Sequence, residues 1–217
     1  MVHLITQLIA QLFDPPHCAL CNIFLSQRQL WCHSCAQQLR PVVSTTLSIS
    51  AAHQMPVFAA AAYAEPIKQL IISKWWSQRV ASWQLGDLIW QRTPVSVLEF
   101  DYIVPVPLHW RRYAWRGYNQ AQIIAQTISK QSGKPVVKLV KRVTATEQQS
   151  SVSVEMRDKN VRDAFIFCGD KEQYRGASFL IVDDLMTTGA TLKWVAKNVV
   201  DSCHPQKINA VVAARTV

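Results

Sequence analysis

Short apolar segments alternate with longer amphipathic segments over most of the chain. We expect the apolar segments to be buried strands, because Pro, Gly or polar residues bound them. These segments are VFAAAAY (57–63), YIVPVP (102–107), PVVKLV (135–140), AFIFC (164–168), SFLIVD (178–183) and INAVVAA (208–214). The segments that predict helices are EPIKQLIISKWW (65–76), VASWQLGDLIWQ (80–91), GYNQAQIIAQTISKQSGK (117–134) and TGATLKWVAKNVVDSC (188–203). Strands that alternate with helices predict an α/β fold with a parallel sheet flanked by helices.

The remaining segments do not fit this alternation. Residues 1–13 carry apolar side chains at helical spacing and have no basic region or cleavage site, so we expect a short docking helix and not a signal peptide. Residues 40–56 are rich in Ser, Thr and Pro and indicate a connection, and the polar residues 144–163 indicate a long loop. No apolar run is long enough to cross a bilayer, so the sequence predicts a soluble, cytoplasmic protein without membrane insertion.

The tryptophans and two isolated cysteines allow simple interpretations. Trp76, Trp83 and Trp90 recur at a spacing that places them on one helical face, which favours packing in the core over stacking on nucleic acid. Trp110 and Trp115 lie among arginines and are stronger candidates for contact with nucleic acid. The isolated cysteines, which we interpret as small core residues, are Cys168 and Cys203.

Four further cysteines form two Cys-x-x-Cys pairs, CALC (18–21) and CHSC (32–35). Four thiolates from two such pairs can surround a structural Zn²⁺ tetrahedrally at about 2.3 Å. Two disulfides or a redox pair are the alternatives, but disulfides fit a cytoplasmic chain poorly and a redox motif needs only one pair. We therefore predict a small zinc-ribbon-like module over residues 1–40, with Zn²⁺ bound by Cys18, Cys21, Cys32 and Cys35.

Composition and charge narrow the function only slightly. The chain has 217 residues, 49% of them hydrophobic and 17% charged, so it can bury a substantial core and is not disordered as a whole. Its 23 Lys and Arg against 14 Asp and Glu give a net charge of +9. A basic balance of this kind favours phosphorylated ligands or nucleic acid as partners.

The strongest chemical signal is FLIVDDLMTTGAT (179–191). Four apolar residues predict a strand buried on both faces, and Asp183 and Asp184 follow at its carboxyl end, where open α/β sheets bind ligands. The residues that follow the two acids supply hydroxyls, backbone N–H groups and a helix N-terminus for an anion. They are Thr187, Thr188, Gly189, Ala190 and Thr191. N–H groups for a phosphate beside carboxylates for neighbouring hydroxyls match a ribose 5-phosphate.

On these residues the sequence resembles the type I phosphoribosyltransferases, whose signature is four apolar residues, two acids and a Thr-Gly-rich loop. It is similar in particular to their ComF/GntX branch, which is associated with DNA uptake and competence. The resemblance extends over nearly the whole chain, through the cysteine module, VPVPLHWRRYAWRGYNQA (104–121), TEQQ (146–149), RDKNVRDAF (157–165) and VDDLMTTGATL (182–192). It implies a type I phosphoribosyltransferase-like domain over residues 57–217.

The resemblance also implies a ligand and roles for single residues. Asp183 and Asp184 would hold the ribose 2′- and 3′-hydroxyls of Mg²⁺-bound phosphoribosyl pyrophosphate, or of a related ribose phosphate, and residues 187–191 its 5-phosphate. The family's pyrophosphate loop corresponds to the turn after residues 102–107, where Arg111, Arg112 and Arg116 can neutralise the leaving diphosphate. Two hypotheses stay open: a phosphoribosyltransferase with an unknown acceptor, and a non-catalytic ligand sensor or binding module for single-stranded DNA or a competence helicase.

Overall fold

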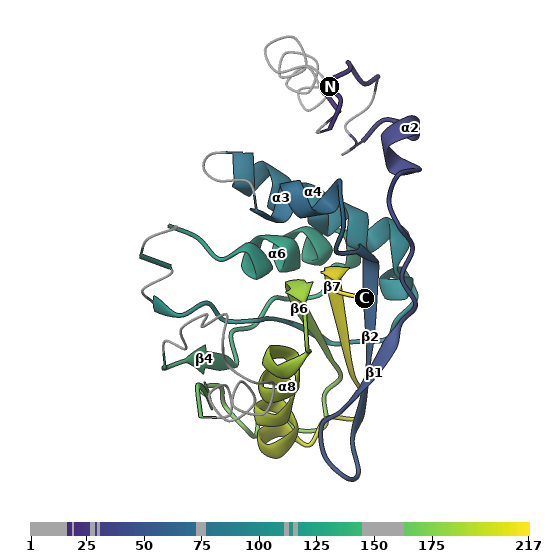
Figure 1. The fold of residues 1–217 in the computed structure, drawn as a ribbon. Coiled ribbons are helices and arrows are strands. Elements are labelled where there is room, and N and C mark those ends of the chain that lie inside the picture. Colours follow the sequence, from purple (N-terminus) through teal and green to yellow (C-terminus); the bar gives the residue numbers. More distant parts are fainter. Residues whose placement is uncertain are drawn as a thin grey trace, which may run out of the picture.

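A mixed sheet forms the centre of the fold (Figure 1). The computed structural model describes residues 17–18, 20–26, 29, 31–72, 77–110, 113–114, 117–144 and 163–217. Within these residues the sheet has five strands, in the spatial order β1 (Thr45–Ser48), β2 (Gln54–Ala62), β7 (Ile208–Arg215), β6 (Phe179–Met186) and β3 (Tyr102–Pro105). β2, β7, β6 and β3 run parallel to one another, and the edge strand β1 runs antiparallel. The predicted parallel sheet is therefore confirmed for the strands that carry the core, and β1 makes the sheet mixed.

Helices cover both faces of this sheet. α3 (Ile67–Ile72), α4 (Ser77–Arg92) and α6 (Gln120–Ser132) lie on one side, and α8 (Ala190–Cys203) lies on the other (Figure 1). In β6, Leu180 and Val182 join the apolar cluster that contains α4 and α6 side chains, whereas Phe179 and Ile181 join the cluster that contains α8 side chains. Side chains alternate along a strand, so a run of consecutive apolar residues serves both faces at once. A short 3-10 helix, η1 (Pro94–Ser96), follows α4.

A separate two-stranded ladder follows the β3 edge of the sheet. It consists of β4 (Val140–Arg142) and β5 (Phe165–Phe167), which pair antiparallel. The chain just before β4 adds one isolated parallel bridge to the main sheet, in which Val137 N donates to Ile103 O at 2.9 Å. The predicted strands at 135–140 and 164–168 are thus correct in part, because β5 pairs with β4 and not with the main sheet. The predicted loop at 144–163 lies, apart from its ends, outside the described residues.

Residues 40–56 contain structure that the sequence did not indicate. The prediction of a plain connection is wrong, because β1 lies within this range and β2 already begins at Gln54. Ile49 N donates to His53 O at 3.0 Å in the turn between the two strands. β1 alternates between half-buried and exposed positions, and its Leu47 packs on the cluster that contains α8 side chains. An edge strand of this kind buries one face only, so the short polar sequence TTLS gives no clear strand signal.

The cysteine-rich segment packs against the rest of the chain through one side. It contains the short helix α2 (His33–Ala36). Leu25 and Trp31 are buried in the same apolar cluster as side chains of α4. Arg92, the last residue of α4, donates from Nη2 to the carbonyl of Ala36 at 3.4 Å. The segment is therefore in contact with the helical layer that covers one face of the sheet.

The interpretations of the isolated side chains need two corrections. Cys203 is buried, as predicted, but Cys168 is exposed. Trp90 packs on the core, as predicted, but Trp83 is 51% exposed. Regular spacing places side chains on one face of a helix, but it does not show that a neighbour covers that whole face. Trp76 and the predicted helix at 1–13 lie outside the described residues, and within those residues no helix could cross a membrane.

Candidate functional site

The two acids lie inside β6, near its carboxyl end. Asp183 is paired with Val212 of β7, and β6 continues beyond both acids to Met186. On the other side of β6, the pairing with β3 ends at Val182, directly before the acids. Asp183 Oδ1 accepts a hydrogen bond of 2.9 Å from the Asp184 N–H, which holds the carboxylate against its own backbone. Both acids are half-buried at the edge where β3 leaves the sheet.

The turn after β6 depends on a glycine. Gly189 is the N-cap residue of α8, with a φ of 81°, and it is buried. A Cβ at this position would lie 2.9 Å from Met186 Cε and 3.0 Å from Leu47 Cδ1. Both the positive φ and the close neighbours therefore require glycine. The turn is packed down onto β6 and β1, so its backbone conformation is fixed by the sheet beneath it.

The threonines of this turn stand on its outer side. Thr187 and Thr188 are exposed, and Thr191 is half-buried in the first turn of α8. Thr188 Oγ1 accepts from Ala190 N at 3.4 Å, and the Thr187 carbonyl accepts from Thr216 Oγ1 at 3.3 Å. The turn thus presents hydroxyls and a helix N-terminus to solvent directly beside the acids, which is an arrangement that suits an anion.

The loop after β3 runs beside the acids. Val106 N donates to Val182 O at 2.9 Å, so the contact between the two chain segments continues past the end of β3. Asn119 closes this loop, because its Nδ2 donates to Val106 O at 2.9 Å and its Oδ1 caps α6 by accepting from Ala121 N at 3.1 Å. The loop corresponds to the predicted pyrophosphate loop. Its side chains that lie outside the described residues are Arg111, Arg112, Trp115 and Arg116.

The site carries an excess of negative charge. Burial and then the charge of Asp184 raise the pKa of Asp183 well above its usual range, and the charge of Arg142 offsets part of this increase. The pKa of Tyr63 is raised as well, first by burial and then by the charges of Asp184 and Glu65. A bound cation, or donors that point at the carboxylates, would relieve this repulsion.

The sequence analysis assigned no role in the site to Arg142 or Tyr63. No local sequence pattern places β4, which contains Arg142, near β6. Tyr63 directly follows β2, and its N–H donates to Arg215 O at 2.7 Å. Since ligands of parallel sheets bind at the carboxyl ends of strands, the position of Tyr63 at the end of an apolar segment was a usable signal.

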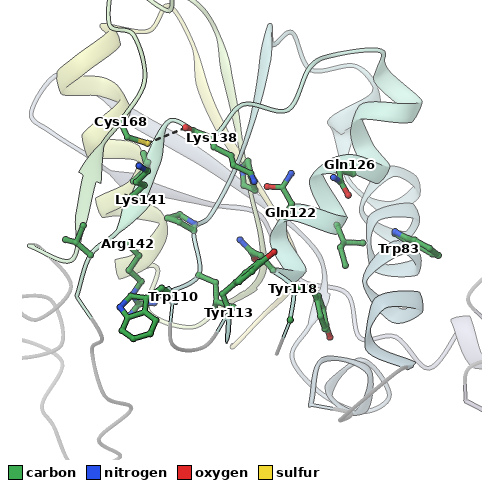
Figure 2. Close-up of a pocket in the computed structure, with 18 residues that line it drawn as sticks. Trp83, Trp110, Tyr113, Tyr118, Gln122, Gln126, Lys138, Lys141, Arg142 and Cys168 are labelled. Carbon is green, nitrogen blue, oxygen red and sulfur yellow. Dashed lines mark hydrogen bonds between the residues drawn. The ribbon is translucent and has the colours of Figure 1, made fainter. Parts of the chain in front are cut away.

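A pocket of about 840 Å³ lies between the loop after β3, α6 and β4 (Figure 2). Arg142 lines this pocket and also acts electrostatically on Asp183, so the two features are neighbours. The aromatic, amide and lysine side chains that line it are Trp83, Trp110, Tyr113, Tyr118, Asn119, Gln122, Gln126, Lys138 and Lys141.

The cysteines predicted to bind zinc form a compact cluster. The Sγ atoms of Cys18, Cys21, Cys32 and Cys35 all lie within 4.8 Å of one another, and those of Cys21 and Cys32 are 3.7 Å apart. Sulfurs placed tetrahedrally at about 2.3 Å from Zn²⁺ are about 3.8 Å from one another. All four cysteines are free thiols, so the alternative of two disulfides is not supported. The cluster can accept a tetrahedral metal ion with little rearrangement.

Hydrogen bonds prepare one of these thiols for a metal. Burial raises the pKa of Cys18, but the backbone N–H groups of Cys21, Cys32 and Leu20 outweigh this effect and lower the pKa to about 6. Burial and then the neighbouring thiols raise the pKa of Cys35 to about 12. Metal ligation requires thiolates, so an ion would be needed to hold all four sulfurs in the ionised form at once.

The chain is similar in sequence to known proteins. The phosphoribosyl transferase domain family matches residues 114–216. The chain is 29% identical over 189 residues to Competence protein F of Haemophilus influenzae, and this match covers 84% of this chain and 77% of that protein. It is 27% identical over 192 residues to DNA utilization protein YhgH of Salmonella typhimurium, which covers 83% of this chain and 82% of that protein. Among solved structures, the allosteric regulatory enzyme of purine biosynthesis aligns with a TM-score of 0.42 and 15% identity, over 62% of this chain and 25% of that chain.

The α/β sheet with its acid-bearing β6 and the matched domain define a phosphoribosyltransferase-domain protein. The match to Competence protein F and to YhgH extends beyond that domain to most of the chain. The resemblance to the ComF/YhgH (GntX) family that was found in the sequence is therefore confirmed, and the chain carries an N-terminal four-cysteine cluster.

Proposed function

We propose that the chain binds phosphoribosyl pyrophosphate with Mg²⁺ at the carboxyl end of β6. Asp183 and Asp184 hold the ribose 2′- and 3′-hydroxyls, and residues 187–191 hold the 5-phosphate. The main support for this proposal is the order of carboxylates and helix N-terminus along the chain. Two half-buried carboxylates are followed directly by a glycine-capped helix N-terminus, at the edge of the sheet where such folds bind ligands.

The electrostatics of the acids suit both the diol and the cation. Asp183 and Asp184 repel each other, and the effect is visible in the raised pKa of Asp183. Hydroxyl groups that donate to the carboxylates favour their ionised form, and Mg²⁺ is usually held by one or two carboxylates together with substrate phosphates. Binding of the ligand therefore removes a repulsion that exists in the free protein.

We assign the leaving diphosphate to the loop after β3. This loop lies against β6 through the bond from Val106 N to Val182 O, so it borders the acids directly. The cations that we propose for the diphosphate are Arg111, Arg112 and Arg116. Guanidinium groups bind phosphate oxygens in pairs and keep their charge at all physiological pH values.

The reaction that this arrangement supports is phosphoribosyl transfer. The bond between the anomeric carbon and the diphosphate oxygen breaks, diphosphate leaves with the electron pair, and an acceptor of unknown identity bonds to the anomeric carbon. Positioning of the ribose and stabilisation of the leaving charge supply the catalysis, so the protein needs no nucleophile of its own. The alternative is a sensor that binds the same ligand without turnover.

A diphosphate-release assay separates the enzyme from the sensor. The protein with phosphoribosyl pyrophosphate and Mg²⁺ is screened against nucleobases, nucleotides and short single-stranded DNA as acceptors. Release that depends on one acceptor class and is lost in the Asp183→Asn, Asp184→Asn double variant supports the transferase. Tight ligand binding without release for any acceptor supports the sensor.

We also propose that the chain consists of two regions with different roles. Residues 1–40 form a module whose four cysteines bind a structural Zn²⁺, and the segment from residue 57 to residue 217 forms the phosphoribosyltransferase-like domain. Since β1 belongs to the same sheet, this domain extends back at least to Thr45. The compact sulfur cluster supports the zinc assignment.

DNA is the proposed partner outside the small-molecule site. The relatives are named for competence and DNA utilization, and this chain has a net charge of +9. We propose that single-stranded DNA contacts the basic loop of Arg111, Arg112 and Arg116, and that the cysteine module docks a competence helicase. Binding of DNA should weaken steeply as salt is added, and replacing the three arginines by Ala should flatten this dependence. Unchanged salt dependence in the triple variant, measured by fluorescence anisotropy, would place the DNA elsewhere.

A further inference from the structure

We infer that the pocket between α6, β4 and the loop after β3 is a second ligand site, which binds a nucleotide through its base and its phosphate. Aromatic side chains reach it from two separate parts of the chain: Trp83 on α4 is 51% exposed, and Trp110 and Tyr113 after β3 are 63% and 54% exposed. Large exposed aromatic rings that border one pocket offer flat apolar faces on which a base can stack.

The polar groups of the pocket match the rest of a nucleotide. Gln122 and Gln126 project from α6, and their amides can both donate to and accept from the edge of a base (Figure 2). Across from α6, the cations of the β4 side are Lys138, Lys141 and Arg142 (Figure 2). No Asp or Glu is among the described residues that line the pocket. Stacking faces, amides and three cations in one pocket favour a planar heterocycle that carries phosphate.

The volume of the pocket is consistent with such a ligand. At about 840 Å³ it lies within the range of about 300–1,000 Å³ that is typical of sites for small molecules. Trp83 and Arg142 lie at opposite ends of the labelled side chains, with the α6 glutamines between them (Figure 2). The lining thus has an aromatic part and a cationic part with amides between them, as a ligand with a base and a phosphate requires.

The position of the pocket argues against its being the acceptor site. In a direct displacement at an anomeric carbon, the nucleophile approaches the face opposite the leaving group. The pocket is lined by Pro105, Pro107 and Leu108, so it lies on the side where the diphosphate was placed. This step rests on the proposed function, whereas the chemistry of the pocket does not. The occupant is thus a separate nucleotide, either free or part of a single DNA strand.

A binding experiment with a matched control tests this inference. Thymidine 5′-monophosphate and a short oligothymidylate are titrated into the wild-type protein and into the double variant Trp83→Ala, Lys138→Ala, whose side chains are exposed and distant from Asp183 in the chain. We expect both ligands to bind the wild type and to bind the variant at least about tenfold more weakly, because a stacking face and a phosphate contact are lost. The control Lys130→Ala removes one positive charge from α6 outside the pocket and should change affinity by less than about twofold.

The same samples distinguish the sources of the nucleotide. Tighter binding of the oligothymidylate, with loss in the pocket variant, identifies the ligand as a DNA strand. Equal or tighter binding of the mononucleotide, with the same loss, identifies a free nucleotide. Trp83→Phe with Lys138 unchanged keeps an aromatic face and should bind both ligands nearly as tightly as the wild type. Absence of nucleotide binding in the wild type, or equal affinity in the wild type and the pocket variant, overturns the inference.

Titration of phosphoribosyl pyrophosphate with Mg²⁺ separates failure of this inference from failure of the proposed function. The Asp183→Asn, Asp184→Asn double variant should lose this ligand and keep thymidine 5′-monophosphate. Loss of the nucleotide in that variant, together with its retention in the pocket variant, would place the nucleotide at the acids and contradict the second site. A wild type that binds the nucleotide but not phosphoribosyl pyrophosphate would refute the proposed function alone.

Discussion

The acids of β6 and the cysteine cluster are held in place in different ways. Phe179 to Val182, which precede the acids, are fully buried between two parallel neighbours and two apolar clusters. Of the four cysteines only Cys32 and Cys35 belong to the four-residue helix α2 and its N-cap, and Ile23 and Phe24, next to Cys21, are 57% and 62% exposed. The positions of the acids are therefore set by the buried sheet. The positions of the four cysteines depend more on a metal ion that holds their sulfurs together.

The two sites therefore differ in how far their stability depends on the bound ligand or metal. A site on a buried strand exists before the ligand binds, so ligand binding should change its stability only by mass action. A small cysteine module gains a large part of its folding free energy from the metal. Loss of zinc should therefore unfold one region and leave the other intact.

The largest expected effect is loss of zinc through Cys18→Ser. Purified wild-type protein should contain one Zn²⁺ per chain, and the variant should contain essentially none. The cost to the module should be several kcal/mol, because zinc contributes about 10 kcal/mol or more to the folding of zinc-finger peptides. Metal analysis and limited proteolysis of residues 17–40 measure the two consequences.

The contrast between the two regions is tested on the same variant. Binding of phosphoribosyl pyrophosphate to Cys18→Ser should stay as in the wild type, because β6 doesn't depend on the cluster. Cys168→Ser is the matched control, since Cys168 is exposed and lies outside the cluster, and it should keep zinc and stability. Zinc-free wild-type protein with intact thiols and normal protease resistance would contradict the account of the module.

A smaller effect is expected from Gly189→Ala in the turn after β6. The new Cβ would lie within 3.0 Å of side chains of Met186 and Leu47, and the residue would keep a φ of 81°. We expect a loss of about 2–4 kcal/mol in the free energy of unfolding, from the clash and the unfavourable φ together. Urea denaturation followed by circular dichroism measures it.

Gly133→Ala separates the two causes. Gly133 has a similar φ of 72°, but nothing lies within 4 Å of the position of its Cβ. Only the cost of the left-handed conformation remains, about 1 kcal/mol. If both variants lose the same free energy, the packing of the turn on β1 and β6 does not hold the phosphate loop in place.

The smallest expected effect is the pH dependence of Asp183→Asn. The pKa of Asp183 is raised in the folded protein, so its favourable contribution is complete below the unfolded pKa of about 4 and is lost as the pH rises through the folded pKa. The Asn variant lacks this titration and should gain stability over the wild type with rising pH, on the order of 1 kcal/mol.

Denaturation of the two proteins at about pH 4.5 and about pH 7.5 measures this difference. Asp201→Asn is the control, because Asp201 is exposed and pairs with Lys197 at 2.9 Å. The control should show no gain with rising pH. A difference between Asp183→Asn and the wild type that shrinks with rising pH would mean that Asp183 is stabilised as a carboxylate.

The sequence predicted those elements whose signal is local. The run FLIV identified β6 as a strand buried on both faces, and the segment 117–134 predicted the helix that the structure has at α6. The two Cys-x-x-Cys pairs identified the cluster because its ligands lie close together in the chain. In each case the information needed for the prediction lies within a few residues.

The features that escaped prediction depend on contacts between distant segments. β1 becomes a strand because β2 offers it an edge, and its sequence alone does not indicate this. Arg142 acts on Asp183 because the β4–β5 ladder lies near β6, and Trp83 borders the pocket that α6 also lines. Local sequence patterns specify the secondary-structure elements, whereas the tertiary contacts of a side chain depend on how the sheet is assembled.

The most direct test of the central claim is a calorimetric titration of phosphoribosyl pyrophosphate with Mg²⁺. The proteins compared are the wild type, the Asp183→Asn, Asp184→Asn double variant, and a control, Glu172→Gln with Asp201→Asn, which removes two exposed carboxylates elsewhere. We predict binding to the wild type and to the control with equal affinity, and a loss of at least about 100-fold in the acid variant, because charge-assisted bonds to the ligand disappear. Equal affinity in all three proteins would contradict the assignment of this site.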